Sequence, residues 1–268
     1  MKKHLPGMFL VLVLLLGIGI LLYPMISNRY SMYRQSHVIR DYETSAGAMA
    51  DPAADRMLRE AREYNDALGR LSFPMADFLQ VPGYEEILDV SGTGAMCYLK
   101  IPRIHVELPV YHGTDSSVLD VGIGHVQGSS LPVGGPGTHC VLSAHRGLPS
   151  ARLFTDLDKL EIGDCFQIVI LGRIHEYCVD QILVVEPEET QALGICRDED
   201  YCTLVTCTPY GVNTHRLLVR GSRVQETAPE QPVTEERAPS YGPVILIAAV
   251  VPAAVLWLCL RRKKKIRP

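Results

Sequence analysis

The sequence predicts a mainly β domain, either a closed antiparallel sandwich or a barrel, that lies outside the cell between two membrane-spanning segments. Three observations support this prediction. From Met96 onward, short β-forming runs alternate with Gly, Pro and Asp at the spacing of all-β folds. A stretch almost free of charge lies near each end of the 268-residue chain. Acidic residues outnumber basic ones, 30 to 26, and no basic patch interrupts the middle, which argues against a nucleic-acid-binding protein.

The first apolar stretch, residues 8–26, predicts a transmembrane anchor. Its sequence, "MFLVLVLLLGIGILLYPMI", is long enough for a helix to cross a hydrocarbon core of about 30 Å. Lys2 and Lys3 would also suit the charged start of a cleavable signal peptide, but no Ala-x-Ala-like cleavage site follows. We therefore predict an uncleaved signal-anchor, with residues 1–7 in the cytoplasm.

Residues 243–260, "PVILIAAVVPAAVLWLCL", predict a second transmembrane helix. A run of cations from Arg261 to Lys265 follows it, and such runs mark the cytoplasmic side of a membrane helix. The alternative is a core helix with a solvated basic end, which accounts less well for this run. The basic tail, residues 261–268, is therefore predicted to be cytoplasmic like the N-terminus, and the chain between the two spans extracytoplasmic.

The extracytoplasmic part divides into three segments by composition. Residues 27–92 are predicted to hold helical and irregular, lid-like structure. Residues 93–225 form the β domain, and residues 226–242 form a linker rich in Pro, Glu and Thr.

An amphipathic helix is predicted in the first of these segments. Asp51 as the N-cap and Pro52 as the first helical residue are a typical start signal. Apolar residues then recur at helical spacing as far as Leu68. The stretch that follows, up to Gly92, is less regular.

Seven strand-like runs occupy the β domain. The two runs around Leu171-Gly172-Arg173 predict a hairpin, and one helical turn is predicted within "SARLFTDLDKL". The runs are "MCYLKI", "VELPVY", "HCVLSAH", "CFQIVIL", "IHEYCVDQILVV", "CTLVTC" and "RLLVRGSRV".

The cysteines favour neither a complete disulfide framework nor a metal site. One of the eight, Cys259, lies in the second apolar stretch, so an odd number remains outside and at least one is unpaired within the chain. No Cys-x-x-Cys pair occurs, and no phosphate loop or dinucleotide motif is present, so we expect neither a metal nor a cofactor. The other seven are Cys97, Cys140, Cys165, Cys178, Cys196, Cys202 and Cys207.

The stretch "TLVTCTPYGVNTHRLLVRG", residues 203–221, places a cysteine where a strand ends. Pro209 ends the strand, and an antiparallel return would bring Arg216 back beside Cys207. A nearby cation favours the nucleophilic thiolate form of a cysteine, and a guanidinium can donate hydrogen bonds to an oxyanion formed by thiolate attack. The residues alone leave open a second interpretation, in which Cys207 is a small buried side chain.

A proton-transferring histidine would complete such a site. His145 has one advantage, because "VLSAHRG" places it where a strand meets a glycine-containing loop, a common location for functional residues. The residues alone do not choose between it and its competitors, which are His105, His112, His125, His139, His175 and His215.

The chain resembles the class C, pilus-building sortases over about Tyr64 to Val224. "TLVTCTPYGVNTHRLLVRG" is similar to the family's Thr-Leu-x-Thr-Cys signature with its downstream arginine. "GHVQGSSLPVGGPGTHCVLSAHRGLPSARLFTDLDKLEIGD" resembles the segment that carries the family's histidine, and "YLKIPRIHVELPVYHG" resembles its first strands. The resemblance implies a closed eight-stranded sortase-type β-barrel with short helices, an N-terminal helical and lid segment, and two flanking transmembrane helices.

The resemblance also implies roles for four residues. Cys207 would be the nucleophile, His145 the general acid and base, and Arg216 the group that stabilises the oxyanion and holds the substrate. Thr206 would help to shape the substrate site. The alternative is that threonine occurs there only because it favours a β-strand.

The reaction implied by the resemblance is a transpeptidation at the cell membrane. The enzyme would cleave an LPxTG-like sorting signal of a secreted pilin between Thr and Gly through a thioester. A lysine of another pilin subunit would then form an isopeptide bond. The alternatives are a sortase that anchors surface proteins to the cell wall, a cysteine hydrolase, and a non-catalytic, membrane-tethered β-barrel that binds sorting signals.

Two features depart from the family pattern. The family's Asp-Pro-aromatic lid motif is missing from the expected region, which reads "RLSFPMADFLQ". Either Phe73 or Phe78 substitutes for the aromatic residue, which makes them the lid candidates, or the lid is absent. Cys140 stands where the resemblance leads us to expect serine. We expect it to fill a buried strand position, and the alternative is an inhibitory disulfide with Cys207.

Overall fold

The computed structural model describes residues 5–90 and 92–224. Its elements, in chain order, are α1 (Leu5–Ala48), α2 (Asp51–Leu68), α3 (Pro74–Asp77), η2 (Phe78–Gln80), β1 (Ala95–Ile101), η3 (Pro102–Ile104), β2 (Val106–His112), α4 (Ser116–Leu119), β3 (Ile123–His125), β4 (Thr138–Ser143), η4 (Leu157–Lys159), β5 (Cys165–Ile170), β6 (Arg173–Val185), η5 (Gln191–Leu193), β7 (Asp200–Thr208) and β8 (His215–Arg223).

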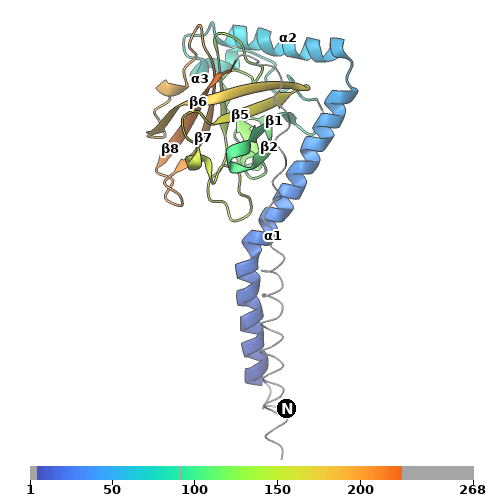
Figure 1. The fold of residues 1–268 in the computed structure, drawn as a ribbon, viewed down its shortest axis with the longest axis vertical. Helices are drawn as coiled ribbons and strands as arrows, with labels where there is room; N and C mark the ends of the chain where they lie inside the picture. The colour runs from blue at the N-terminus through green and yellow to red at the C-terminus, as the bar shows by residue number, and fades with distance from the viewer. Residues whose placement is uncertain (1–4, 91, 225–268) are drawn as a thin grey trace, which may run out of the picture. The chain divides into compact units, whose positions relative to one another are not determined.

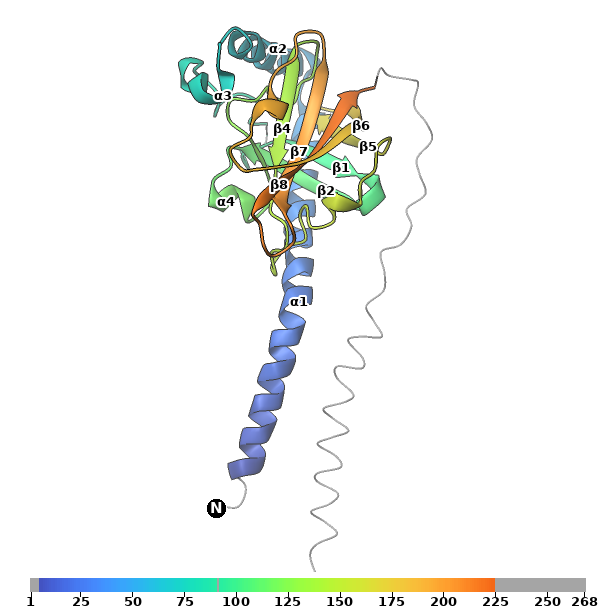
Figure 2. The same cartoon turned by 90° about the vertical axis from the view of Figure 1, so that its left-hand side faces the viewer.

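The eight strands close into a barrel in the order β1-β2-β3-β4-β7-β8-β6-β5 (Figures 1 and 2). Each strand therefore has a hydrogen-bonded neighbour on both sides. The predicted closed, mainly β fold is confirmed, and the strand number is the one that the family resemblance implied.

The expectation of a purely antiparallel barrel is wrong at two places. β2 pairs with β3 in parallel, and β4 pairs with β7 in parallel. A parallel neighbour requires a crossover connection, and the chain supplies one through α4 between β2 and β3 and a longer one through β5 and β6 between β4 and β7. Because β4 and β7 run in the same direction, their C-terminal ends lie at the same edge of the barrel.

The short strand β3 was missed in the sequence because three residues, one of them glycine, give no alternation to detect. Its Gly124 has no room for a side chain. A Cβ atom there would lie 2.4 Å from the backbone oxygen of Gly113. The close approach of these two backbones explains the glycine.

The predicted hairpin between β5 and β6 is confirmed. Ile170 pairs with Arg173, which leaves Leu171 and Gly172 as a two-residue turn. Both have positive φ, +48° and +75°, as the tight turns of such hairpins require. The helical turn predicted in "SARLFTDLDKL" is the 3₁₀ turn η4.

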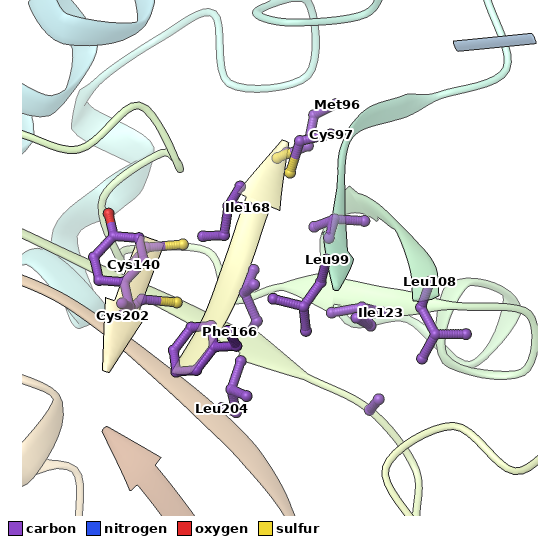
Figure 3. Packing of buried hydrophobic residues seen from close by; sticks show 14 of the residues in the cluster. Met96, Cys97, Leu99, Leu108, Ile123, Cys140, Phe166, Ile168, Cys202 and Leu204 are labelled. Carbon is purple, nitrogen blue, oxygen red and sulfur yellow. The ribbon is translucent and has the colours of Figure 1, made fainter. Parts of the chain in front are cut away.

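The barrel interior is filled by apolar side chains. Phe166 and Tyr177 stack with ring centroids 5.7 Å apart, and a Cβ atom on Gly221 would lie 2.7 Å from the Phe166 ring. Figure 3 shows Cys140 and Cys202 in this interior, near Phe166 and Ile168. The packing leaves no space to enlarge a residue at Gly221 without moving the ring.

Helix α2 packs its apolar face on the barrel through Leu58, Ala61 and Leu68. The Asn65 side chain adds two buried hydrogen bonds to Leu131: its Nδ2 donates to the carbonyl at 3.1 Å, and its Oδ1 accepts from the backbone N–H at 2.7 Å. These contacts fix the helix against the loop that precedes β4.

The start of α2 differs from the prediction by one residue. Ala50, not Asp51, is the N-cap of α2, and no side chain caps the helix. Asp51 lies in the first turn, where its negative charge still complements the helix dipole. Helix α1 continues without a break past residue 26, the predicted end of the first span, to Ala48.

Helix α1 is apolar in its N-terminal half and exposes this apolar surface. Leu12 and Leu16 are about two-thirds exposed, and Val11–Ala48 is long and apolar enough to include a membrane span. The part of α1 up to Leu22 belongs to a unit separate from the one that begins at Tyr23. The predicted second span, residues 243–260, the linker and the basic tail lie outside the described residues.

One disulfide joins Cys165 and Cys178, which face each other across β5 and β6. The free cysteines within the described chain are Cys97, Cys140, Cys196, Cys202 and Cys207. Cys97, Cys140 and Cys202 are buried, Cys196 is exposed and Cys207 is half-buried.

Candidate active site

Cys207 and Arg216 face each other on adjacent strands. The antiparallel register of β7 and β8 pairs Cys207 directly with Arg216, one step before the loop that joins the strands. Side chains in such a pair have Cβ atoms about 5 Å apart. Both residues are half-buried. The predicted antiparallel return is thus confirmed, and it places Arg216 directly opposite Cys207.

His145 lies at the same edge of the barrel, just beyond the end of β4. The parallel register of β4 and β7 pairs Ser143 with Val205. Continued by two residues along each strand, this register sets His145 beside Cys207. The chains stay adjacent past the last paired residues, because the Ala144 N–H donates to the Val205 carbonyl at 3.2 Å. His145 is half-buried.

Thr206 connects the two chains that carry the cysteine and the histidine. It is buried, and its hydroxyl donates to the Ala144 carbonyl at 2.8 Å. The residue before Cys207 is therefore held to the residue before His145. This hydrogen bond fixes the spacing of the two side chains.

Arg146 ties the loops together and was not identified from the sequence. Its Nη1 donates to the Thr208 hydroxyl at 3.2 Å, and its Nη2 forms an ion pair with Asp158. The guanidinium also lies 6.0 Å from the centre of the Tyr210 ring. An arginine directly after the histidine, in a glycine-containing loop, was the only signal in the sequence.

The Arg216 guanidinium bonds to its own loop. Its Nη1 donates to the carbonyls of Asn213 at 3.3 Å and His215 at 3.1 Å. A guanidinium has five N–H donors in a fixed plane, so these contacts orient the group without using all of them. The remaining donors can serve a ligand that reaches Cys207.

An apolar surface adjoins the cysteine on the outer face of the barrel. Strand alternation sends Val205 to the same face as Cys207, and its cross-strand partner Leu218 lies beside Arg216 on that face. Val205, Leu218 and Val141 form a buried cluster. The partly buried side chains packed on it come from four segments: Met75, Val126, Leu183, Val185, Ala192 and Leu193.

The two lid candidates occupy different environments. Phe73 is 71% exposed, whereas Phe78 is packed against the main core. Between them, Met75 contacts the apolar cluster on the outer face. The backbone of Pro74 and Met75 also lies so close to Gly128 that a Cβ atom there would be 2.7 Å from the Met75 Cα atom. The segment is thus docked on the barrel, and the residue facing the cluster is Met75.

Cys140 fills a buried position in the barrel interior, as expected. It is 2% exposed and pairs in register with Cys202. Cys202 lies five residues before Cys207, which corresponds to about 16 Å along a strand. A disulfide requires Cα atoms no more than about 7 Å apart. The alternative of an inhibitory disulfide between Cys140 and Cys207 is therefore wrong.

Two buried histidines elsewhere, His125 and His139, have structural partners. The Nε2–H of His125 donates to the Ser130 carbonyl at 2.9 Å, and its Nδ1 lies 2.9 Å from the Tyr84 hydroxyl. His139 contacts the Thr203 hydroxyl at 2.7 Å, and burial lowers its pKa. Neither lies at the Cys207 edge of the barrel.

The three side chains at this edge have the chemistry of covalent acyl transfer. A thiol can attack a carbonyl, an imidazole can carry the protons, and a guanidinium can stabilise the oxyanion. Within the described residues, no group of three or more His, Cys, Asp or Glu side chains is arranged to hold a metal ion.

Comparison with known proteins identifies relatives that share this arrangement of strands. A family model described as a sortase domain matches residues 99–224. The structure of sortase C1 from Streptococcus agalactiae is 46% identical, with a TM-score of 0.66, and the match covers 71% of this chain and 100% of that one. Sortase C from Streptococcus pneumoniae, described in connection with pilin substrate specificity, is 41% identical, with a TM-score of 0.65 and coverages of 72% and 100%.

A more distant relative matches over a shorter region. Sortase D from Bacillus subtilis is 30% identical over 129 residues, which are 47% of this chain and 62% of that protein. The chain thus spans somewhat less than two thirds of this relative's length.

Proposed function

Because this chain belongs to the sortase family of cysteine transpeptidases, with class C enzymes among its structural neighbours, we propose that it is a pilin polymerase. Its substrate would be the LPxTG-like sorting signal of a secreted pilin. It would cleave that signal between Thr and Gly and link the new Thr carboxyl group to a lysine of another pilin subunit.

One observation carries this proposal: the register of β4, β7 and β8 brings His145, Cys207 and Arg216 to one edge of the barrel. Three chemically different groups at the ends of three adjacent strands are what a covalent acyl transfer requires. A binding module would need none of them in that combination.

In the first half-reaction, the Cys207 sulfur attacks the carbonyl carbon of the substrate threonine. The carbon–nitrogen bond to glycine breaks, and His145 gives a proton to the departing amine. The product is a thioester between Cys207 and the threonine carboxyl group. Arg216 donates hydrogen bonds to the oxyanion that forms on the way.

In the second half-reaction, a lysine amine of another pilin attacks the thioester carbonyl. His145 accepts a proton from this amine, the carbon–sulfur bond breaks, and the Cys207 thiolate is released. An isopeptide bond joins the two subunits. A thioester suits this exchange because it stays reactive toward an amine.

The apolar cluster of Val141, Val205 and Leu218 supports a peptide-binding role for the outer face. It lies on the face of Cys207 and continues away from it along the strands. The apolar leucine and proline of an LPxTG-like signal would pack there in place of Met75, which covers the cluster, while the threonine carbonyl reaches the cysteine. Thr206 contributes indirectly by holding the end of β4 to β7.

The candidate membrane anchor in α1 supports a location at the cell membrane. We place the barrel on the extracytoplasmic side, with the predicted second span at residues 243–260 returning the C-terminus to the cytoplasm. Enzyme and pilin precursors would then meet at the same surface.

The proposal is tested with the full chain in detergent micelles and a purified pilin that carries an LPxTG-like tail. Covalent ladders on a denaturing gel are expected with the wild-type protein and not with Cys207→Ala. Cys196→Ala is the matched control, because Cys196 is a free but exposed cysteine elsewhere. It is expected to leave the ladders unchanged.

Other outcomes identify the competing functions. Cleaved pilin without ladders, in the presence of an acceptor subunit, would indicate a hydrolase or a wall-anchoring sortase. Transfer to a peptidoglycan-like amine but not to pilin would select the wall-anchoring function. Binding of the tail that is equal in wild type and Cys207→Ala, without any cleavage, would show a non-catalytic binding module.

A further inference from the structure

A second site lies at the opposite end of strands β7 and β8 from Cys207. It is an open cavity of about 740 Å³ between the start of β7 at Asp200 and the end of β8 at Arg223. The turn between β5 and β6 and the loop that precedes β4 complete its walls. The proposed transpeptidation uses none of these residues.

Three arginines from three different elements line this cavity: Arg62 on α2, Arg173 on β6 and Arg223 on β8. Arg173 forms an ion pair with Asp55 at 2.6 Å. Within the described part of the chain, neither Arg62 nor Arg223 is in an ion pair with an acidic side chain. Asp200 also lines the cavity, so three arginines and one carboxylate leave it with a net positive charge even when Asp55 is counted against Arg173.

Two buried nitrogen atoms in the cavity have no hydrogen-bond partner among the described residues. They are Nδ1 of His175 and Nη1 of Arg223. His175 is 93% buried, since only 7% of its surface is exposed. An unpaired buried polar group costs free energy, so two such groups in one cavity indicate that a ligand satisfies them.

Both nitrogen atoms face the same point beside Gly134. A Cβ atom built on this glycine would lie 3.1 Å from His175 Nδ1 and 3.1 Å from Arg223 Nη1. Gly134 has a φ of +63°, so the backbone conformation also favours glycine. A side chain at this position would therefore press against both nitrogens, and its absence lets them converge beside the glycine backbone.

Asp200 adds an acceptor at the same point. Its Oδ2 accepts from the Gly135 N–H at 2.7 Å, and its Oδ1 accepts from the Tyr177 hydroxyl at 2.9 Å. Oδ2 would lie 2.8 Å from the same Cβ position on Gly134. A carboxylate oxygen has a second lone pair, so Asp200 can still accept a hydrogen bond from a ligand.

From this geometry we propose that the cavity binds a phosphate group that also offers an O–H, such as hydrogen phosphate or the phosphate ester of a polyol. Its oxygens would accept from Arg223 Nη1 and His175 Nδ1, with Arg62 and Arg173 contributing charge at the rim. Its O–H would donate to Asp200 Oδ2. Guanidinium groups match the geometry of phosphate oxygens well.

The state of His175 fits a donor rather than a charged partner. Burial, followed by the charges of Arg223, Arg62 and Arg173, lowers its pKa to about 4. The ring is therefore neutral near neutral pH, and the tautomer with the proton on Nδ1 donates one hydrogen bond. The positive charge that attracts the anion comes from the arginines.

The first experiment is a calorimetric titration of the full chain in a maltoside detergent, in a buffer without phosphate. Hydrogen phosphate and glycerol 1-phosphate are expected to bind. Sulfate is expected to bind more weakly because it has no proton to give to Asp200, and acetate more weakly because it has fewer oxygens and less charge. Absence of phosphate binding, or acetate binding as tightly as phosphate, would overturn the proposal.

Variants then test the assignment to this cavity. Arg223→Gln is expected to weaken phosphate binding by about tenfold to a hundredfold, since it removes a charged hydrogen-bond donor. Arg103→Gln removes the same charge from an exposed arginine outside the cavity and is expected to leave binding unchanged. Equal affinity of wild type and Arg223→Gln would overturn the proposal.

Two further variants guard against misfolding of Arg223→Gln. Arg62→Gln changes an exposed residue of α2 and is expected to weaken binding severalfold without affecting the fold. His175→Leu removes Nδ1, whereas His175→Asn keeps an N–H donor near its position. Weaker binding by His175→Leu with recovery in His175→Asn is expected, and equal binding by both would overturn the role of Nδ1.

The source of the phosphate is tested by repeating the titration in nanodiscs. If nanodiscs of phosphatidylglycerol abolish the heat of glycerol 1-phosphate binding, the lipid headgroup already occupies the cavity. If the heat of glycerol 1-phosphate binding is the same in phosphatidylglycerol nanodiscs as in nanodiscs of an uncharged glycolipid, the ligand is a soluble phosphate. Either result supports a phosphate site, provided that Arg223→Gln removes the effect.

Discussion

The two ends of strands β7 and β8 each carry an arginine near a histidine, but their surroundings differ. At one end, Cys207, Arg216 and His145 are half-buried and lie where strands pass into loops. At the other end, His175 is buried, and both its Nδ1 and the Nη1 of Arg223 lack partners among the described residues. The first end is an edge where strands pass into loops, whereas the second is a cavity lined by residues of several elements.

This difference suggests how one barrel separates chemistry from binding. A covalent intermediate must be reached by two substrates in turn, first the sorting signal and then the acceptor amine. The reacting groups accordingly lie next to loops, where the site is accessible. Arg216 is held by carbonyls of its own loop and keeps donors free. A small anion needs only fixed donors, and the Arg223 end provides them from rigid elements. The predictions below test this contrast.

The largest effect is expected from His145→Ala. A general acid and base contributes about 10²–10⁴-fold to the rate, and kcat/KM for peptide cleavage and amine transfer should fall by a factor in this range. His105→Asn is the matched control, because His105 is exposed in a left-handed turn that asparagine tolerates. Retention of wild-type activity in His145→Ala would show that another histidine transfers the proton.

Arg216→Ala is expected to have the next largest effect. Loss of an oxyanion donor lowers kcat by about 10²–10³-fold. Arg216→Lys keeps the charge but loses the planar donor group, so it should recover only part of the activity. The measurement is kcat and KM for a sorting-signal peptide. Full activity of Arg216→Lys would mean that charge alone matters and that no directed hydrogen bond is made.

At the other end, His175 is expected to make stability depend on pH. Its folded pKa of about 4 lies below the value of about 6.5 for an unfolded histidine. Between these values the unfolded chain binds the proton, so the free energy of unfolding falls as pH drops from about 6.5 to about 4. The groups that face the ring are Arg62, Arg173, Arg223 and Asp200.

The loss should amount to about 3 kcal/mol by pH 4. Urea unfolding of the phosphate-free protein at pH 7, 5.5 and 4 measures it. His175→Asn cannot titrate in this range, so its difference between pH 7 and pH 4 should be smaller by that amount. His105→Asn should behave like wild type, and the same slope in both variants would contradict the assignment.

The sequence was sufficient where structure is local. Alternating residues and turn signals located seven of the strands, and the hairpin formed by β7 and β8 could be predicted because its partners are close in the chain. The pairing of Cys207 with Arg216 follows from that hairpin. In contrast, the three-residue strand β3 has no periodic pattern long enough to detect.

The sequence was insufficient where distant segments meet. The choice of His145 among seven histidines rested on family resemblance. His145 follows β4 and Cys207 lies on β7, and these strands are separated in the chain by the complete β5–β6 hairpin, so their parallel pairing could not be predicted from local patterns. The phosphate cavity combines residues of α2, β6, β7 and β8. Nothing in the spacing of Arg62, His175 and Arg223 along the chain indicates that they meet.

The smallest effect is expected at the segment that borders the Cys207 end. Met75 packs on the apolar cluster that we assign to the sorting signal, so it competes with the substrate for that surface. Met75→Ala should lower KM for the peptide by about three- to tenfold, because a partly buried methionine contributes on the order of 1 kcal/mol. Cys207 should also react faster with a thiol reagent.

Phe73→Ala and Leu79→Ala are the matched controls for Met75→Ala, since both side chains are largely exposed on the same segment. Neither should change KM or the rate of thiol modification. Phe78→Ala should lower stability instead, because Phe78 is packed on the core. If Phe73→Ala alone opened the site, the lid would depend on an aromatic residue after all. If Met75→Ala changed neither KM nor the rate of thiol modification, the docked segment would not cover the substrate surface. The strands and loops of the barrel alone would then determine how accessible each end is.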